Sequence, residues 1–280
     1  MPNVNARIVS VNSLDRALTF TASSSQEGEL ASSMLNDIKT DTHRAVGTSV
    51  VYSMSWPVEE LIEAWHAPWT NWSPTATARV RGYSDEAATI LIYDSGVILP
   101  CPAPAISLRS PWTAITSASA YKHGGGAHAF HWLPKGTMVK KLTVTVDDPD
   151  NRQEYLECGR QIVGEYYEVE YNPEYGAPVS FASLSTQYRD GDTNLRVNVG
   201  GKFKKQQLSF AAMNTADRDF MIDLFHANGI EVPFIWSLYN DGSDPVLERT
   251  HMMYAHLVDI GQLSTPSFRK WSTGLPIESV

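Results

Sequence analysis

The chain has 280 residues, 42% of them hydrophobic, and its 31 acidic residues outnumber 22 basic ones, which gives a formal net charge of −9. This balance argues against sequence-specific nucleic-acid binding and against anionic membranes, because basic side chains supply most of the affinity for both. No stretch reaches the roughly 20 apolar residues of a membrane span, and the start, MPNVNARIVSVNS, lacks the basic and apolar regions of a secretory signal. We therefore expect neither membrane insertion nor a leader.

Alternation of apolar and polar residues with a period of two dominates the chain. It occurs, in chain order, in TSVVYSMSW (48–56), KKLTVTVDD (140–148), NLRVNVG (194–200) and VPFIWSLY (232–239). Such alternation is typical of half-buried antiparallel strands. Because Gly, Pro, Asn and Asp clusters separate the strands, the sequence predicts a mostly β protein built from sandwiches or barrels.

One α-helix is predicted near residues 215–228, in NTADRDFMIDLFHANG. Asn214 or Thr215 is a suitable N-cap, and Asn228–Gly229 is a natural left-handed stop. Six of the eight tryptophans precede residue 160, whereas the helix follows it. We therefore predict two domains, an N-terminal β-sandwich over 1–160 and a C-terminal β-rich domain over 161–280 that carries the helix.

The segment YKHGGGAHAFHW (121–132) invites two chemical interpretations. HGGG resembles an oxyanion-hole loop, but the sequence has no G-x-S-x-G nucleophile elbow to supply the serine. His123, His128 and His131 are candidate zinc ligands, but structural zinc takes four ligands, usually with cysteine, and the nearest thiol, Cys101, is remote. We interpret the segment as a glycine-rich loop that enters a strand, and predict no metal or cofactor.

Acidic clusters and cysteines receive structural interpretations as well. Two segments gather oxygen atoms that could bind calcium: Asp147, Asp148, Asp150 and Asn151 in the first, and Asn240, Asp241 and Asp244 in the second. Because Asp, Asn, Gly and Pro are also the usual turn-forming residues, we favour turns over calcium sites. Glu59, Glu60 and Glu63 lie on one short segment rather than across a cleft, which does not favour a glycosidase. Two cysteines, Cys101 and Cys158, are too few for a disulfide framework.

Aromatic and basic residues between positions 65 and 81 are candidates for a binding surface. Indole faces stack on sugar rings and guanidinium groups donate to hydroxyls, so the candidate residues for glycan contact are Trp65, Trp69, Trp72, Arg79 and Arg81. The alternative, which we favour, is that the tryptophans fill the core of the sandwich or a subunit interface.

Longer segments resemble known families. LTFTASSSQEGELASSMLNDIKTDTHRAVGTSVVYSMSW (18–56) resembles the opening of discoidin-like, galactose-binding-type jelly rolls. DDPDNRQEYLECGRQIVGEYYEVEYNPEYGAPVSF (147–181) is similar to a recurring pattern of bacteriophage tail proteins, and the last hundred residues are similar in order to the ring-forming part of distal tail and baseplate proteins of long-tailed phages.

The resemblance implies an N-terminal jelly roll and a non-enzymatic, structural role in the virion. It implies a homo-oligomeric ring at the tail tip or baseplate, with a hexamer favoured and a trimer possible, assembled in the host cytoplasm and joined to tail-tube and baseplate-hub proteins. It also implies that the jelly roll contacts host-surface saccharides in some members. The alternative function is therefore a non-enzymatic carbohydrate-binding module that contacts host-surface glycans.

Overall fold

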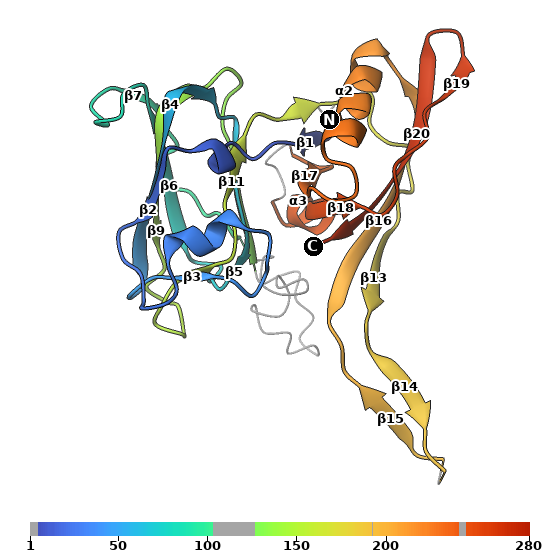
Figure 1. Ribbon diagram of the computed structural model, residues 1–280, viewed down its shortest axis with the longest axis horizontal. Coiled ribbons are helices and arrows are strands. Elements are labelled where there is room, and N and C mark those ends of the chain that lie inside the picture. Colours follow the sequence, from blue (N-terminus) through green and yellow to red (C-terminus); the bar gives the residue numbers. More distant parts are fainter. Residues whose placement is uncertain (1–4, 103–126, 192, 241–244) are drawn as a thin grey trace. The chain divides into compact units, whose positions relative to one another are not determined.

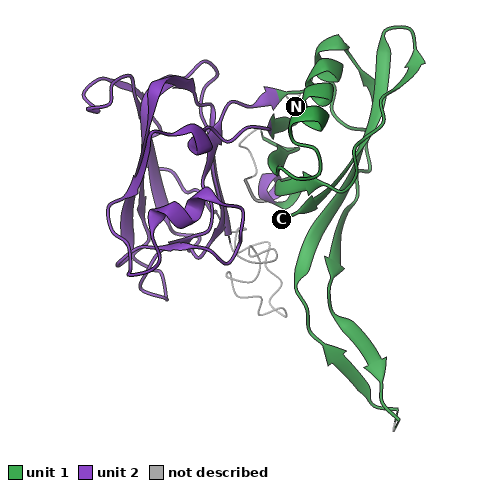
Figure 2. Ribbon diagram, in the orientation of Figure 1, with its two compact units in different colours: residues 1–8, 168–243, 250–280 green, residues 9–167, 244–249 purple. Residues whose placement is uncertain are grey.

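The computed structural model describes residues 5–102, 127–191, 193–240 and 245–280, which form two compact units (Figures 1 and 2). The first, here called the sheet unit, contains the described residues of 5–8, 168–240 and 250–280. The second, the jelly-roll unit, contains those of 9–167 and 245–249. The jelly-roll unit is therefore inserted after the first strand of the sheet unit.

The jelly-roll unit is a sandwich of two five-stranded sheets. One sheet has the order β2 (Thr19–Ala22), β4 (Ser49–Leu61), β9 (Met138–Asp147), β6 (Thr77–Tyr83), β7 (Leu91–Asp94). The other has the order β11 (Ile162–Gly164), β5 (Ala64–Thr70), β10 (Glu157–Cys158), β3 (His43–Arg44), and β8 (Ala127–Trp132) pairs with β5. Two 3₁₀ turns, η1 (Ser13–Arg16) and η2 (Ala31–Leu35), accompany the sandwich.

The period-two segments of the first sheet form its core face. In the antiparallel register of β4 and β9, Tyr52 lies opposite Val144 and Met54 opposite Leu142, and all four side chains are fully buried. Each such side chain contributes roughly 1.5–3 kcal/mol when it leaves water. The intervening residues Ser53 and Thr143 are only partly buried, which is the alternation that the sequence predicts.

The sheet unit consists of an eight-stranded sheet and a separate hairpin. The sheet has the order β12 (Tyr167–Glu168), β1 (Arg7–Val9), β17 (Phe234–Ser237), β18 (Met253–Leu257), β20 (Lys270–Ser279), β16 (Lys202–Met213), β13 (Val179–Ser183), and β19 (Ser264–Ser267) pairs with β20. The hairpin joins β14 (Thr186–Arg189) to β15 (Leu195–Asn198).

The helix α2 (Thr215–Ala227) begins and ends where the sequence predicts. The side chain of its N-cap, Asn214, accepts a hydrogen bond of 2.7 Å from the backbone N–H of Asp217, and Gly229 beyond its end has a φ of +52°. The helix buries Met221, Leu224 and Phe225. A second, shorter helix, α3 (Pro245–His251), was not predicted, although a proline at its first position is a known start signal.

The mostly β, jelly-roll fold class is thus confirmed, with two differences in detail. Strand β17 is buried on both faces rather than alternating, because all four of its residues, Phe234–Ser237, are covered. The predicted division into 1–160 and 161–280 falls a few residues before the point where the chain leaves the jelly-roll unit, after Tyr167, and it places residues 5–8 in the other half. Strand β1 pairs with strands that lie far along the chain, and such long-range pairing leaves no periodic pattern in the sequence.

Candidate functional site

The hairpin β14–β15 carries apolar side chains that its own chain does not cover. We call residues 184–201 the arm; every residue of its two strands is exposed. Leu195 is 53% exposed, Val197 46% and Val199 90%. The period-two segment NLRVNVG therefore forms the predicted strand, but the prediction that it is half-buried is wrong.

The arm has two different faces. Gln187 lies opposite Val197 and Arg189 opposite Leu195, so these four side chains share one face. The other face carries Thr186, Tyr188, Arg196 and Asn198. At the tip, Asp190 accepts hydrogen bonds from the backbone N–H of Asn194 at 2.9 Å and from Arg196 at 3.1 Å. Asp190 therefore makes polar contacts with the opposite strand, whereas Leu195 and Val197 form an apolar stripe.

A tight crossing at the base joins the arm to the sheet. The backbone N–H of Leu184 donates to the carbonyl oxygen of Gly201 at 2.9 Å, and that of Gly200 donates to Ser185 Oγ at 2.9 Å. A Cβ at Gly200 would lie 2.6 Å from the backbone of Leu184, so only glycine allows the two strands to approach this closely. Figure 1 shows that the arm then runs beyond the sheet that carries it.

A hairpin like the arm is only weakly stabilised by its own contacts when water surrounds it. Two-stranded hairpins are marginally stable without a third strand or a packed layer. Their unpaired edges and exposed apolar side chains favour pairing with another chain. In the isolated chain, Leu195 and Val197 are therefore left exposed to solvent.

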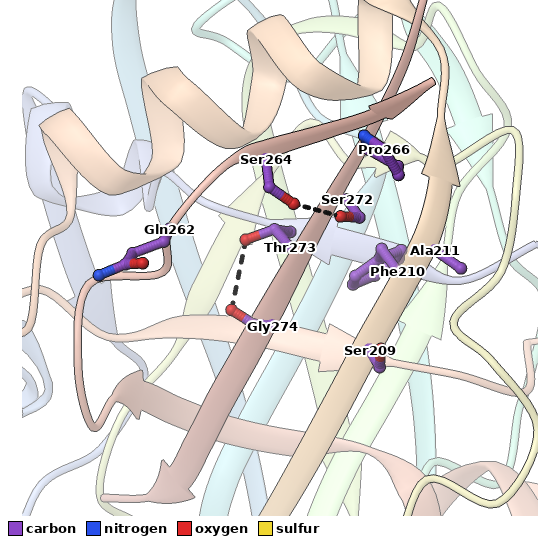
Figure 3. A pocket seen from close by; sticks show the side chains of 9 residues that line it. All are labelled: Ser209, Phe210, Ala211, Gln262, Ser264, Pro266, Ser272, Thr273 and Gly274. Atoms are coloured by element: carbon purple, nitrogen blue, oxygen red, sulfur yellow. Dashed lines mark hydrogen bonds between the residues drawn. The ribbon is translucent and has the colours of Figure 1, made fainter.

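Near β19, away from the arm within the same unit, the sheet carries a trough of about 500 Å³ (Figure 3). Its lining consists of small, polar and uncharged side chains together with one aromatic ring, from Ser209, Phe210, Ala211, Gln262, Ser264, Pro266, Ser272, Thr273 and Gly274. Ser264 and Ser272 share a hydrogen bond of 2.6 Å between their hydroxyls. The described residues that line the trough are uncharged, so they offer a ligand neutral hydrogen bonding.

A smaller hollow of about 280 Å³ lies on the jelly-roll unit beside the edge strand β2. It is lined by η1, η2 and the start of β2, through Leu14, Asp15, Ala17, Leu18, Phe20, Ser32 and Leu35. Both carboxylate oxygens of Asp15 accept from Arg160 Nη2 at 2.9 Å. Burial raises the pKa of Asp15, and the Arg160 guanidinium opposes that shift. Sequence reasoning missed this pair because its members are far apart along the chain.

The histidines considered as candidate zinc ligands do not converge among the described residues. His123 lies outside the described residues. His128 and His131 lie on β8 and contact different partners: His128 Nε2 is 3.2 Å from His66 Nδ1, whereas His131 Nε2 is 2.6 Å from the Tyr93 hydroxyl. Across the ranges that the structure describes, no group of three histidine, cysteine or acidic side chains could hold a metal ion.

Two of the three candidate tryptophans fill the core of the jelly-roll unit. Trp65 and Trp72 are fully buried, and their rings stack with centroids 6.1 Å apart, so neither offers a face to a sugar. Trp69 is partly buried, and Lys39 Nζ lies 5.8 Å from its ring centroid. The tryptophans therefore do not form one open aromatic platform.

The two candidate arginines lie on β6 of the same unit. The side chain of Arg79 pairs with Asp94, with Nε 2.9 Å from Oδ1, and this pairing holds the pKa of Asp94 at about 2. Arg81 lies opposite Asp94 in the register of β6 and β7. The guanidinium of Arg79 is thus already paired with a carboxylate of the protein itself.

The acidic segments serve the fold. Buried Asp148 accepts from the backbone N–H of Ser73 at 2.7 Å and from Asn151 Nδ2 at 3.2 Å, so it organises a turn. Glu63 accepts from the backbone N–H of Gly136, and Glu60 pairs with Arg16 at 3.0 Å. Asp241 and Asp244 lie outside the described residues.

The two cysteines are free and buried. Burial raises the pKa of the Cys101 thiol to about 12 and that of Cys158 further still. Both thiols are therefore protonated near neutral pH, and neither is a poised nucleophile. Among the described residues, no helix combines the length and the apolar composition that crossing a membrane requires.

Neither a protein-family model nor a curated protein sequence matches the chain. Solved structures similar to it include the CBM32 of AlyQ in complex with 4,5-unsaturated mannuronic acid, at 13% identity and a TM-score of 0.35 over 52% of this chain and 94% of that one. The family 32 CBM of Clostridium perfringens NanJ in complex with galactose is 8% identical, with a TM-score of 0.37 over 58% and 99%. A Ruminococcus gnavus GH29 fucosidase in complex with fucose is 12% identical, with a TM-score of 0.38 over 57% of this chain and 27% of that one. The fold assignment rests on the strand order and packing given above.

Proposed function

We propose that the chain is a non-enzymatic structural protein that associates head to tail with copies of itself, as a ring-forming component of the tail tip or baseplate of a long-tailed bacteriophage. The observation that carries the proposal is the arm, whose apolar stripe, Leu195 and Val197, is exposed on a hairpin that extends beyond its own sheet. The phage context rests on the sequence resemblance of residues 147–181 and of the last hundred residues.

A ring requires two different surfaces on each subunit. Head-to-tail interfaces are heterologous, so one surface of each copy must fit a different surface of the next, and the assembly closes when the rotation closes. The arm and the region around β19 lie at different ends of the sheet unit (Figure 1), which suits such an arrangement. We favour a hexamer, with a trimer as the alternative, and tail-tube and baseplate-hub proteins as neighbours.

The trough and the hollow differ in the charge of their described lining residues. The first is lined by uncharged side chains, and the second holds a single carboxylate that is already paired with Arg160. Nucleophilic or acid–base catalysis needs a nucleophile beside a base, or two titrating groups with separated pKa values. Neither cavity supplies such a pair.

Matched substitutions on the arm test the assembly proposal. Val197→Asp and Asn198→Asp add the same charge at neighbouring positions on opposite faces of β15. We expect the wild-type protein to form a discrete oligomer, visible as rings in negative-stain images. Val197→Asp should weaken association at least about tenfold, since burial of one valine contributes roughly 1.5 kcal/mol or more. Asn198→Asp should remain oligomeric. A monomeric wild type would refute the proposal, and so would equal effects of the two variants.

A second candidate function is saccharide binding by the jelly-roll unit. The hollow favours it, because apolar walls beside a fixed hydrogen-bond acceptor suit the two sides of a sugar ring. Titration of the ¹⁵N-labelled protein with simple sugars tests this candidate. Saturable shifts in the jelly-roll unit would support it, and the absence of shifts would contradict it without touching the assembly proposal.

A further inference from the structure

We infer that the hollow between η1, η2 and β2 is a binding site for a single pyranose unit, whose hydroxyl or ammonium donors reach Asp15 and whose C–H face lies against Leu18, Phe20 and Leu35. The inference rests on the saccharide-binding candidate and names its site. It does not depend on assembly through the arm.

The hollow is held open by a buried arginine. The side chain of Arg160 is 3% exposed, and its Nη2 donates to Asp15 on η1 while its Nη1 donates to the carbonyl oxygen of Met34 on η2 at 3.0 Å. Arg160 therefore ties together the two 3₁₀ turns that line the hollow. A site whose walls are fixed before binding loses less entropy when its ligand arrives.

The charges at the rim leave an acceptor for the ligand. Arg160 is shared by two carboxylates, Asp15 at 2.9 Å and Asp37 at 3.0 Å. Each oxygen of Asp15 has one hydrogen bond from Arg160 and further capacity to accept, and the side chain is 48% exposed. The nearby Arg16 is neutralised by Glu60 at 3.0 Å. The free capacity therefore suits a ligand that donates, such as vicinal hydroxyls or an amine.

The walls and the size select a small amphipathic ring. Leu18 is 63% exposed and Leu35 43%, and Phe20 completes the apolar lining, whereas Ser32 adds a hydroxyl. A volume of about 280 Å³ is just below the 300–1,000 Å³ of pockets for drug-sized ligands. One pyranose ring fits these properties because it has an apolar C–H side and hydroxyls at its rim. The hollow would hold only one sugar unit of a longer glycan, and the other units would lie outside it.

Paired variants and two sugars test the site. Methyl β-D-galactopyranoside and D-glucosamine are titrated into the ¹⁵N-labelled full-length protein, and dissociation constants are obtained from backbone shifts. Asp15→Asn should weaken glucosamine binding at least tenfold and galactoside binding several-fold. The matched control, Asp37→Asn, also removes a partner of Arg160 but does not line the hollow, and should change either constant less than twofold. Preference for glucosamine identifies the ammonium as the main donor, and equal binding identifies the hydroxyls.

A wall variant keeps the test decisive if Asp15→Asn does not fold. Leu18→Asn should weaken both sugars at least fivefold, whereas Ile90→Asn, at a similarly exposed leucine-sized position on the same unit, should not. Shifts that map to another part of the jelly-roll unit would refute the hollow but keep the saccharide-binding candidate. Absence of saturable shifts with both sugars would refute both. Equal losses in Asp15→Asn and Asp37→Asn would also overturn the assignment to the hollow.

Discussion

Strands β9 and β15 have the same alternating sequence pattern, but the apolar side chains of β9 are buried and those of β15 are exposed. In β9, the alternating Leu142, Val144 and Val146 are completely buried between the sheets of the jelly-roll unit. In β15 and just beyond it, the alternating Leu195, Val197 and Val199 are between 46% and 90% exposed. Both strands pair antiparallel, but β9 lies between β4 and β6, whereas β15 has the single partner β14 and one open edge.

The difference shows what an alternating pattern specifies. It fixes the strand and the face on which the apolar side chains lie, because the side-chain period of a strand is two. It does not specify which surface covers that face. For β9 the cover is the second sheet of the same unit, whereas for β15 we propose that it is another copy of the chain.

The largest loss of stability should follow a substitution in the buried core of the jelly-roll unit. Trp65→Ala removes a fully buried indole that stacks on Trp72, and should lower the free energy of unfolding of the jelly-roll unit by about 3–5 kcal/mol. Val197→Ala on the exposed arm should change it by less than about 0.5 kcal/mol. Urea unfolding followed by near-ultraviolet circular dichroism measures both. Similar losses would mean that the arm is covered within its own subunit.

The second-largest effect should be a loss of folding stability of the jelly-roll unit at acidic pH. Burial lowers the pKa of His131 to about 4, and burial together with His128 and His131 lowers that of His66 well below its ordinary value. Between pH 6.5 and about 4 the unfolded chain binds more protons, so stability is complete above pH 6.5 and falls as the pH drops through this window. The expected loss from His131 is about 3 kcal/mol.

Unfolding midpoints at pH 7, 5.5 and 4.5 check this dependence. His131→Gln should flatten it, because the variant has one fewer group that gains a proton on unfolding. The arm contains no histidine, so association through the arm should not follow the same titration. If the unfolding midpoint of His131→Gln falls with pH as steeply as that of the wild type, the pH dependence does not come from His131.

A smaller effect is expected at the base of the arm. Gly200→Ala places a Cβ 2.6 Å from the backbone of Leu184, and the strain should cost about 1–3 kcal/mol, mainly by displacing the arm. Association should weaken while the melting temperature of the jelly-roll unit stays the same. Gly201→Ala is the matched control, since nothing lies within 4 Å of its added Cβ. Sedimentation velocity compares the two, and indistinguishable behaviour would show that the crossing does not set the position of the arm.

The smallest effect should follow the loss of the pair between Arg79 and Asp94. The pair is partly exposed, and solvent screens such contacts, so Arg79→Ala should not change the thermal melting curve measurably. The pKa of Asp94, held at about 2 by Arg79, should rise toward its ordinary value, which a carboxyl ¹³C titration detects. Sugar binding in the hollow should be unaffected, and a marked loss would move the binding site to β6.

Local signals explain why parts of the fold were predictable. The cap at Asn214 and the stop at Gly229 bracket α2, and the alternation in residues 48–56 and 140–148 gives β4 and β9. The two-residue strands β3 and β10 are too short to carry a period. The candidate residues illustrate the same limit: Trp65 and Trp72 are close in sequence and stack in the core, but Asp15 meets Arg160 across most of the jelly-roll unit.

The sequence by itself determined the strand pattern, the helix α2 and the apolar face of each strand, because these depend on neighbours within a few residues. Tertiary structure alone decided that the chain returns to β1 to complete the sheet unit, that Arg160 joins two turns around a hollow, and that the apolar face of β15 is left open. Each of these depends on which distant surfaces meet. Local periodicity carries no information about that choice, since the same alternating strand is stable wherever some surface covers its apolar side.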